Sequence, residues 1–151
     1  MAVSRIYKTI FEFADDAVDD NRHVNNVEYV RRLQEVAIEH TRQNGWPPER
    51  LFTCGWTWVV RSHYIEYLLP AQAGEKIALY TWVSNMRRIR SLRKYRFVRV
   101  SDGAVLANAQ TEWVFIDFLT GRPRTIPNEI ILAYDQIPES EEPSIGHTLR
   151  V

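Results

Sequence analysis

The polar residues between Asp19 and Asn26 are the part of this sequence best equipped for chemistry. These eight positions hold two aspartates, three asparagines and one histidine: Asp19, Asp20, Asn21, His23, Asn25 and Asn26. A loop that only had to cap a helix would need one such side chain. A carboxylate close to free backbone N–H groups at a helix start is what a reaction at a carbonyl or phosphate group requires.

Length, charge and cysteine content exclude several classes of protein. The chain has 151 residues, with 19 basic and 19 acidic side chains. We therefore expect a single domain over residues 1–151, with an ordered core at about 5–135, that binds neither nucleic acid nor membranes. The one cysteine, Cys54, predicts a reducing, cytoplasmic location and a buried, small apolar role for its side chain. No metal site or cofactor is expected.

Hydrophobic patterning predicts one strand, one long helix and then four strands. Residues 5–13 are rich in β-branched and aromatic types, and apolar side chains recur at helical spacing from about Asn25 to Asn44, before Gly45. The later strand-like runs cover 56–69, 76–85, 91–101 and 104–117. This order predicts an α+β fold in which the helix packs on one face of a five-stranded antiparallel sheet.

Three local signals complete this outline. Trp46-Pro47-Pro48 predicts a break after the long helix. Asp102-Gly103 is typical of a type I′ hairpin turn between the last two strands. Residues 127–134 are compatible with a short helix, and the tail after Pro138 has no clear pattern.

The polar loop also resembles a known family. The run Asp19-x-Asn21-x-His23-Val24-Asn25-Asn26-Val27-x-Tyr29 resembles the signature of plant acyl-carrier-protein thioesterases. An Asp ten residues before a Tyr at a helix start also resembles the bacterial 4-hydroxybenzoyl-CoA-type thioesterases, and residues 65–75 resemble the strand and turn that commonly follow. The resemblance implies the hotdog fold, a long central helix wrapped by a five-stranded sheet. It also implies hydrolysis of acyl thioesters of coenzyme A or acyl carrier protein, without a cofactor.

The resemblance implies roles for individual residues. Asp19 matches the catalytic acid, either as nucleophile or as the base that activates water. The backbone N–H near Asn26, helped by the helix dipole, would polarise the thioester carbonyl. Asn21 and His23 match positions that hold water or substrate in the plant enzymes, and Asn25 is a further substrate-binding candidate. The same residues fit a plain polar loop with Asp20 or Asn25 as the helix cap.

A second acid used by the plant enzymes has no clear counterpart here. Its position falls close to Pro70, and Glu66 lies nearby with a side chain that could face either side of the sheet. We therefore expect a mechanism closer to the single-Asp bacterial type.

Substrate binding is also predicted for Tyr29 and for a basic run at residues 87–94. Its arginines Arg87, Arg88 and Arg90 would suit the phosphates of coenzyme A or an acidic carrier protein. A solvated turn explains the same residues equally well. No RNA-binding motif accompanies them.

The remaining histidines and tryptophans are interpreted mainly as structural. His63 is expected to make a structural hydrogen bond on a strand, and His40 to lie in the core or an interface. Of the five tryptophans, we expect most in the core or in a subunit contact and one or two in an acyl pocket.

One helix cannot cover both faces of a five-stranded sheet, and edge strands need pairing or protection. Hotdog proteins that resemble this chain form dimers in which the two sheets join and each active site draws on both subunits. A homodimer or a dimer of dimers is therefore expected.

Two alternatives to a hydrolase stay open. One is a hotdog enoyl-thioester hydratase, although its His lies five residues after the Asp and behind a Pro. Here His23 lies four residues after Asp19, with Arg22 in place of the Pro. The other is a non-catalytic hotdog module that binds acyl thioesters.

Overall fold

The computed structural model describes residues 5–20 and 23–142. Strand β1 (Tyr7–Glu12) leads through the 3₁₀ helix η1 (Asp15–Ala17) to the long helix α1 (Asn26–Gln43) and the short helix α2 (Pro48–Thr53). Four long strands follow, namely β2 (Trp56–Tyr67), β3 (Lys76–Arg87), β4 (Arg90–Arg99) and β5 (Val105–Asp117). Helix α3 (Asn128–Leu132) and the 3₁₀ helix η2 (Glu139–Glu141) complete the described chain.

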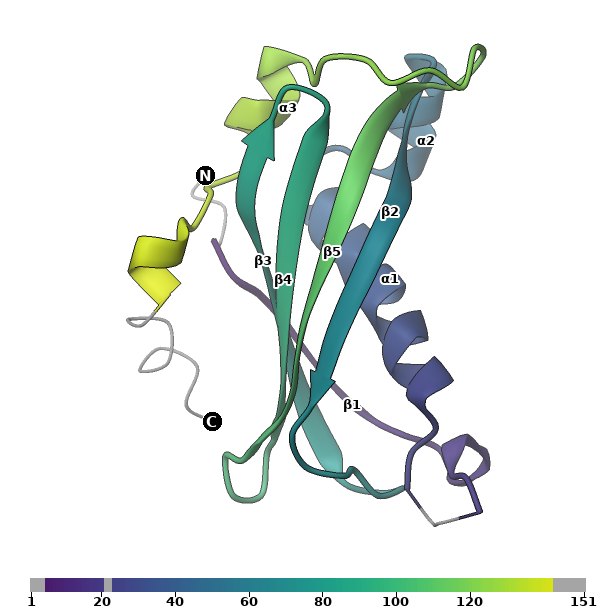
Figure 1. Ribbon diagram of the computed structural model, residues 1–151, viewed down its shortest axis with the longest axis vertical. Coiled ribbons are helices and arrows are strands. Elements are labelled where there is room, and N and C mark those ends of the chain that lie inside the picture. Colours follow the sequence, from purple (N-terminus) through teal and green to yellow (C-terminus); the bar gives the residue numbers. More distant parts are fainter. Residues whose placement is uncertain (1–4, 21–22, 143–151) are drawn as a thin grey trace.

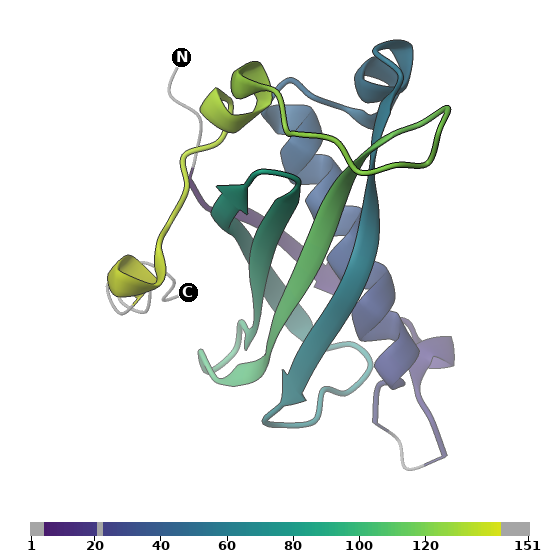
Figure 2. The same cartoon turned by 45° about the horizontal axis from the view of Figure 1, so that its top comes forward.

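The five strands form one antiparallel sheet in the order β1-β3-β4-β5-β2. The sheet is strongly twisted, and α1 lies along one of its faces (Figures 1 and 2). Strands β1 and β2 are the two edges. The predicted α+β architecture, with one long helix on a five-stranded antiparallel sheet, is confirmed.

Helix α1 packs through one apolar stripe. The buried residues recur at intervals of three or four, as an amphipathic helix requires; they are Tyr29, Leu33, Val36, Ala37 and His40. The stripe contacts a core cluster that includes Ile77, Leu79 and Phe97 from β3 and β4. The helix start is fixed by Asn25, whose side chain accepts a hydrogen bond from the backbone N–H of Val27 at 3.0 Å.

The opposite face of the sheet is partly covered by the chain after α3. Ile137 packs there against Ala78, Tyr80 and Trp82 of β3, and Figure 1 shows this segment beside β3. Within residues 5–20 and 23–142, no helix has the length and apolar character needed to cross a membrane.

Helix α2 was not predicted. The two prolines do end α1, but Pro48 also occupies the first turn of α2. Proline suits that position because its missing N–H has no intrahelical partner there and its φ is already helical. The same residues that break one helix therefore begin the next.

Two further expectations were wrong in detail. The β4–β5 hairpin is present, but its turn is not type I′, because Gly103 has φ +74° while Asp102 has no positive φ. Asp102 instead accepts a hydrogen bond from the N–H of Ala104 at 3.0 Å. Cys54 is exposed rather than buried, because it is the residue that caps the C-terminus of α2 on the surface. The short helix expected at 127–134 is confirmed as α3.

Candidate active site

The loop before α1 is closed by hydrogen bonds between Asp19 and His23. The Asp19 N–H donates to the His23 carbonyl at 2.8 Å, and the His23 N–H donates to Asp19 Oδ1 at 3.2 Å. One residue later, the Val24 N–H donates to the carbonyl of Ala71 at 3.0 Å. The loop is thereby held against the connection between β2 and β3, with the Asp19 carboxylate beside the start of α1.

A cavity of about 320 Å³ lies at this point. One side is formed by Asp19, His23, Asn26 and Tyr29, and the other by residues 67–71 from the end of β2 and the turn that follows. Four residues predicted from the sequence therefore share one cavity. Asn21 lies outside the described residues.

Asn26, which lines this cavity, is the first residue of α1. The Val27 N–H is taken by the Asn25 side chain, and the Glu28 N–H donates to the Asn25 carbonyl at 3.0 Å. For the Asn26 N–H, the described part of the chain provides no acceptor. The helix dipole adds partial positive charge at the same place. A carbonyl oxygen seated there would accept a hydrogen bond that strengthens as negative charge develops on it.

Asn25 is mainly a structural residue in this arrangement. Its Oδ1 caps α1, and the two N–H donors of the side-chain amide remain for the predicted contact with substrate. The alternative interpretation of Asn25 as the cap is confirmed.

Tyr29 forms a rigid wall of the cavity. Its ring is buried and meets the rings of Tyr67 and Phe97 nearly edge-on, with centroids 5.1 Å and 4.9 Å away. Burial, with smaller contributions from Tyr67 and the charge of Glu75, raises the pKa of Tyr29 to about 12. The phenol is therefore neutral at physiological pH and is able to donate a hydrogen bond.

The far wall of the cavity was not assigned to the site from the sequence. Backbone hydrogen bonds from Leu68 and Leu69 to the carbonyl of Leu106, at 2.8 Å and 3.1 Å, hold this wall in place. Both leucine side chains are exposed, as is Tyr67. The sequence signal that could have identified these residues is the strand-and-turn pattern at residues 65–75.

Glu66 is not the missing second acid. It pairs with Asn108 and lines a separate cavity together with Tyr64 and Arg96, whereas the neighbouring Tyr67 faces Asp19. Alternation along β2 therefore turns the Glu66 carboxylate away from the candidate site.

The predicted basic residues lie far from Asp19 within one chain. Arg87, Arg88 and Arg90 form the hairpin between β3 and β4, at the opposite end of the sheet from the start of α1 (Figure 1). The Arg90 side chain lies 3.2 Å from the carboxylate of Glu112. The structure does not bring this group to the cavity of its own chain.

The two structural histidines agree with expectation. His63 Nδ1 lies 2.8 Å from Thr111 Oγ1, and burial lowers the pKa of His63. His40 is buried in the core beside Arg93. Neither lines the cavity at Asp19.

This architecture is the hotdog fold. An acyl-ACP thioesterase from Bacteroides thetaiotaomicron has a similar structure, with a TM-score of 0.80 and 24% identity over 89% of this chain and 56% of that one. A 12:0-ACP thioesterase from Umbellularia californica gives a TM-score of 0.78 with 17% identity over 91% of this chain and 58% of that one. The chain spans just over half the length of each, and these likenesses establish the fold.

The family follows from the sequence match. Residues 13–133 match the model of the thioesterase-like superfamily, and the chain therefore belongs to that superfamily. A curated relative, the acyl-CoA thioester hydrolase YbgC of Escherichia coli, is 25% identical over 113 residues, which are 75% of this chain and 84% of the relative. The predicted class of protein, a hotdog-fold thioesterase, is confirmed.

Proposed function

We propose that this protein hydrolyses acyl thioesters of coenzyme A or acyl carrier protein in the cavity at the start of α1. The observation that carries the proposal is that Asp19 and Asn26 line the same cavity and that the backbone N–H of Asn26 has no acceptor among the described residues. One group supplies the attack on a thioester carbonyl and the other stabilises the oxyanion that forms.

The reaction needs few steps. The thioester carbonyl carbon sits beside Asp19 and its oxygen accepts the Asn26 N–H. Asp19 either attacks the carbon, giving an anhydride that water then opens, or removes a proton from an attacking water. In the first route, the tetrahedral intermediate expels the thiolate as the anhydride forms, and water then releases the carboxylic acid and restores Asp19. In the second route, the tetrahedral intermediate expels the thiolate and leaves the carboxylic acid directly. In both routes a proton from the water ends on the thiolate. His23, which lines the same cavity, holds the water or the substrate beside the acid.

The mechanism that the described residues favour is the single-acid one. Glu66 lines a different cavity, so the proposal assigns no second carboxylate from β2 to the reaction. The loop of this chain therefore resembles the plant enzymes in sequence, whereas the proposed mechanism resembles that of the bacterial 4-hydroxybenzoyl-CoA-type enzymes.

The direct test is Asp19→Asn, with Asp20→Asn as the matched control. Thiol release from a panel of acyl-CoA thioesters is measured together with thermal stability. We expect Asp19→Asn to lose about 10²-fold or more in turnover with unchanged stability, and Asp20→Asn to behave like the wild type. Equal effects of the two substitutions would contradict the proposal.

The same panel separates the alternatives. Loss of enoyl absorbance without thiol release would identify a hydratase. Tight acyl-CoA binding with turnover no better than that of Asp19→Ala would identify a non-catalytic module.

We also propose a homodimer, or a dimer of dimers, joined through β2. In the described part of the chain, the outer edge of β2 pairs with no strand, and Val59 and Tyr64 on this strand are 39% and 61% exposed. Antiparallel pairing with β2 of a second copy would satisfy this edge. It would also place the Arg87–Arg90 hairpin at the same end of the dimer as the partner's Asp19 cavity, where its charge suits the phosphates of coenzyme A.

Two other expectations are retained as proposals. A single domain over residues 1–151 is supported by the core that α1 shares with β1, β3, β4 and β5. A cytoplasmic location is supported by the exposed thiol of Cys54, since free exposed cysteines persist in reducing compartments.

A further inference from the structure

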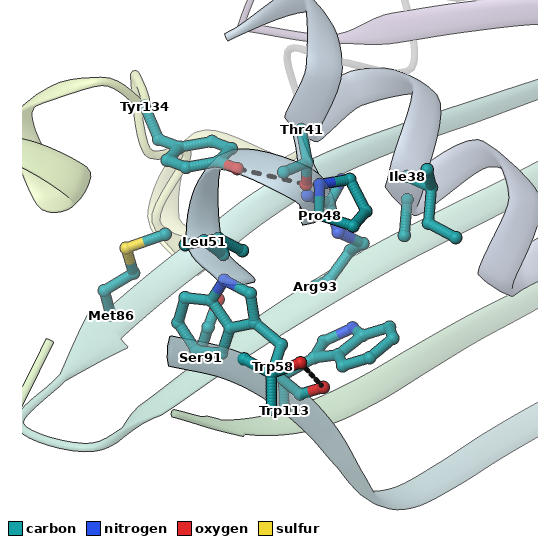
Figure 3. Close-up of a pocket in the computed structure, with 12 residues that line it drawn as sticks. Ile38, Thr41, Pro48, Leu51, Trp58, Met86, Ser91, Arg93, Trp113 and Tyr134 are labelled. Atoms are coloured by element: carbon teal, nitrogen blue, oxygen red, sulfur yellow. Dashed lines mark hydrogen bonds between the residues drawn. The ribbon is translucent and has the colours of Figure 1, made fainter. Parts of the chain in front are cut away.

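A second cavity, of about 250 Å³, lies towards the C-terminal end of α1 (Figure 3). Its walls are mostly apolar and come from α1, α2 and the sheet. They include Ile38, Leu51, Trp58, Met86 and Trp113. Its lining residues on α1, Ala37 to Thr41, come 11 to 15 residues after Asn26, which is roughly 16–22 Å along the helix. It is therefore a separate site within one chain.

The lining of this cavity includes a buried guanidinium group. Arg93 is 4% exposed, and its Nη1 donates to Thr81 Oγ1 at 3.1 Å and lies 2.9 Å from His40 Nδ1. Arginine can only donate, so His40 Nδ1 must be the acceptor and the imidazole is neutral. Neither partner balances the positive charge of Arg93.

The surrounding residues do not balance it either. Among the described residues, no carboxylate lies within 4.0 Å of Arg93. Two neighbouring phenols, Tyr95 and Tyr134, have raised pKa values because burial outweighs the opposing effect of the Arg93 charge, so both are neutral near pH 7. Both hydrogen bonds that the guanidinium group makes to described residues use Nη1. Its Nη2 and Nε have no acceptor among the described residues.

A buried cation without a counter-charge is unfavourable, whereas a guanidinium binds a carboxylate through two parallel hydrogen bonds. The approach to the cavity is also positive. Met86 and Ser91 line it, and the Arg87–Arg90 hairpin connects these two residues. The charge of that hairpin would raise the local concentration of anions.

We propose that this cavity binds an apolar carboxylate, with the carboxylate on Arg93 and the apolar body beside Trp58 and Trp113. A cavity of about 150 Å³ admits benzene, so the volume here suits one aromatic ring or a short alkyl chain. Two sources share this chemistry. One is the far end of the acyl group of the substrate, and this source rests on the proposed function. The other is a free carboxylic acid, such as a reaction product.

Binding is tested first with free acids. The full chain is titrated with benzoate and octanoate, and with benzamide and octanamide as neutral counterparts, by calorimetry and tryptophan fluorescence. We expect saturable binding of the acids, at least about tenfold tighter than that of the amides. Arg93→Met should abolish this preference and Arg93→Lys should retain part of it. Equal affinity for acids and amides, or no saturation with either, would overturn the proposal.

A second variant guards against misfolding of the Arg93 substitutions. Ile38→Trp narrows the cavity from its rim, where Ile38 is 43% exposed, without removing Arg93. Leu132→Trp is the matched control, since Leu132 is 80% exposed and does not line the cavity. We expect acid binding to disappear in Ile38→Trp only. Wild-type affinity in Ile38→Trp would place the ligand elsewhere and reject the site.

A kinetic comparison then identifies the source. Coenzyme A thioesters of dicarboxylic acids, which end in a free carboxylate, are compared with thioesters of equal length that end in a methyl group. A higher kcat/KM for the carboxylate-ended series, lost in Arg93→Met and partly kept in Arg93→Lys, assigns the cavity to the substrate. No difference, together with retained binding of free acids, assigns it to a separate ligand. Acid binding should persist in Asp19→Asn, so failure of the hydrolase proposal remains distinguishable.

Discussion

Asp19 and His23 are joined by two hydrogen bonds, one from each backbone N–H, at 2.8 Å and 3.2 Å. The second of these bonds ends on the Asp19 carboxylate itself. The backbone N–H of His23 therefore helps to orient the acid, and both residues line the cavity. In the proposed mechanism, this hydrogen bond holds the carboxylate in place before any substrate arrives.

The proposed oxyanion donor is the backbone N–H of Asn26, which can be removed only by substitution with proline. Asn26 is the first residue of α1, where proline is tolerated, and Asn25 has φ −64° and ψ 137°, which suits a residue before proline. We expect Asn26→Pro to lower kcat by about 10²–10³ with little change in stability. Asn26→Ala, which keeps the N–H, is the control. A kcat for Asn26→Pro equal to that of Asn26→Ala would remove this donor from the mechanism.

The basic hairpin should affect binding more than turnover. We expect Arg88→Ala to raise KM for an acyl-CoA by about 3–10-fold, more at low salt, and to leave kcat nearly unchanged. The KM for the matching pantetheine thioester, which lacks the nucleotide phosphates, should not respond. Arg31→Ala, an exposed arginine on α1, is the control. An equal rise of KM for both substrates would show that Arg88 does not bind the phosphates.

The edge of β2 should control assembly. A charge at Val59 on this edge strand would be buried if two copies pair there, so we expect Val59→Glu to give a smaller species by light scattering. Ile10→Glu is the matched substitution on the other edge strand, β1, where Ile10 is 52% exposed. It should leave the mass unchanged. If Ile10→Glu dissociates the protein and Val59→Glu does not, the dimer forms through β1.

Tyr29 should make stability fall in alkaline solution. Its pKa is raised to about 12 in the folded chain, against about 10 in the unfolded chain. The unfolded state therefore loses this proton first, and the stabilisation present below pH 10 is lost as pH rises towards 12. Between pH 10 and 12, we expect the free energy of unfolding of the wild type to fall by roughly 2 kcal/mol more than that of Tyr29→Phe, as measured by urea unfolding. Parallel curves for the two proteins would show that the phenol does not titrate differently on folding.

The sequence predicted the elements of this fold because their signals are local. The helical repeat that ends at Gly45 and the alternation of β5 are both contained in short windows. The sequence also grouped Asp19, His23 and Asn26, which line one side of the candidate cavity, because these residues are close together in the chain. The opposite wall, residues 67–71, was not predicted from the sequence. Its position depends on the pairing of β2 with β5, whose paired residues are about fifty positions apart in the chain.

The burial of Arg93 could have been predicted from the alternating pattern of its strand. In the sequence Arg93 belongs to a basic run that was interpreted as a solvated turn or a phosphate site. Alternation along β4 places Arg93 with Tyr95 and Phe97 among the buried residues, while Lys94 and Arg96 are only partly buried. A strand pattern of period two could have separated the inward arginine from its outward neighbours.

The hydrogen bond from the Val24 N–H to the Ala71 carbonyl joins the two sides of the cavity that holds Asp19. The distance between these sides is therefore dictated by main-chain geometry. Replacing Leu68 or Leu69 would alter the shape and the hydrophobicity of the cavity entrance but would not change its width. Relatives with other acyl preferences could thus arise by exchanging these two side chains, without re-engineering the frame that carries the acid.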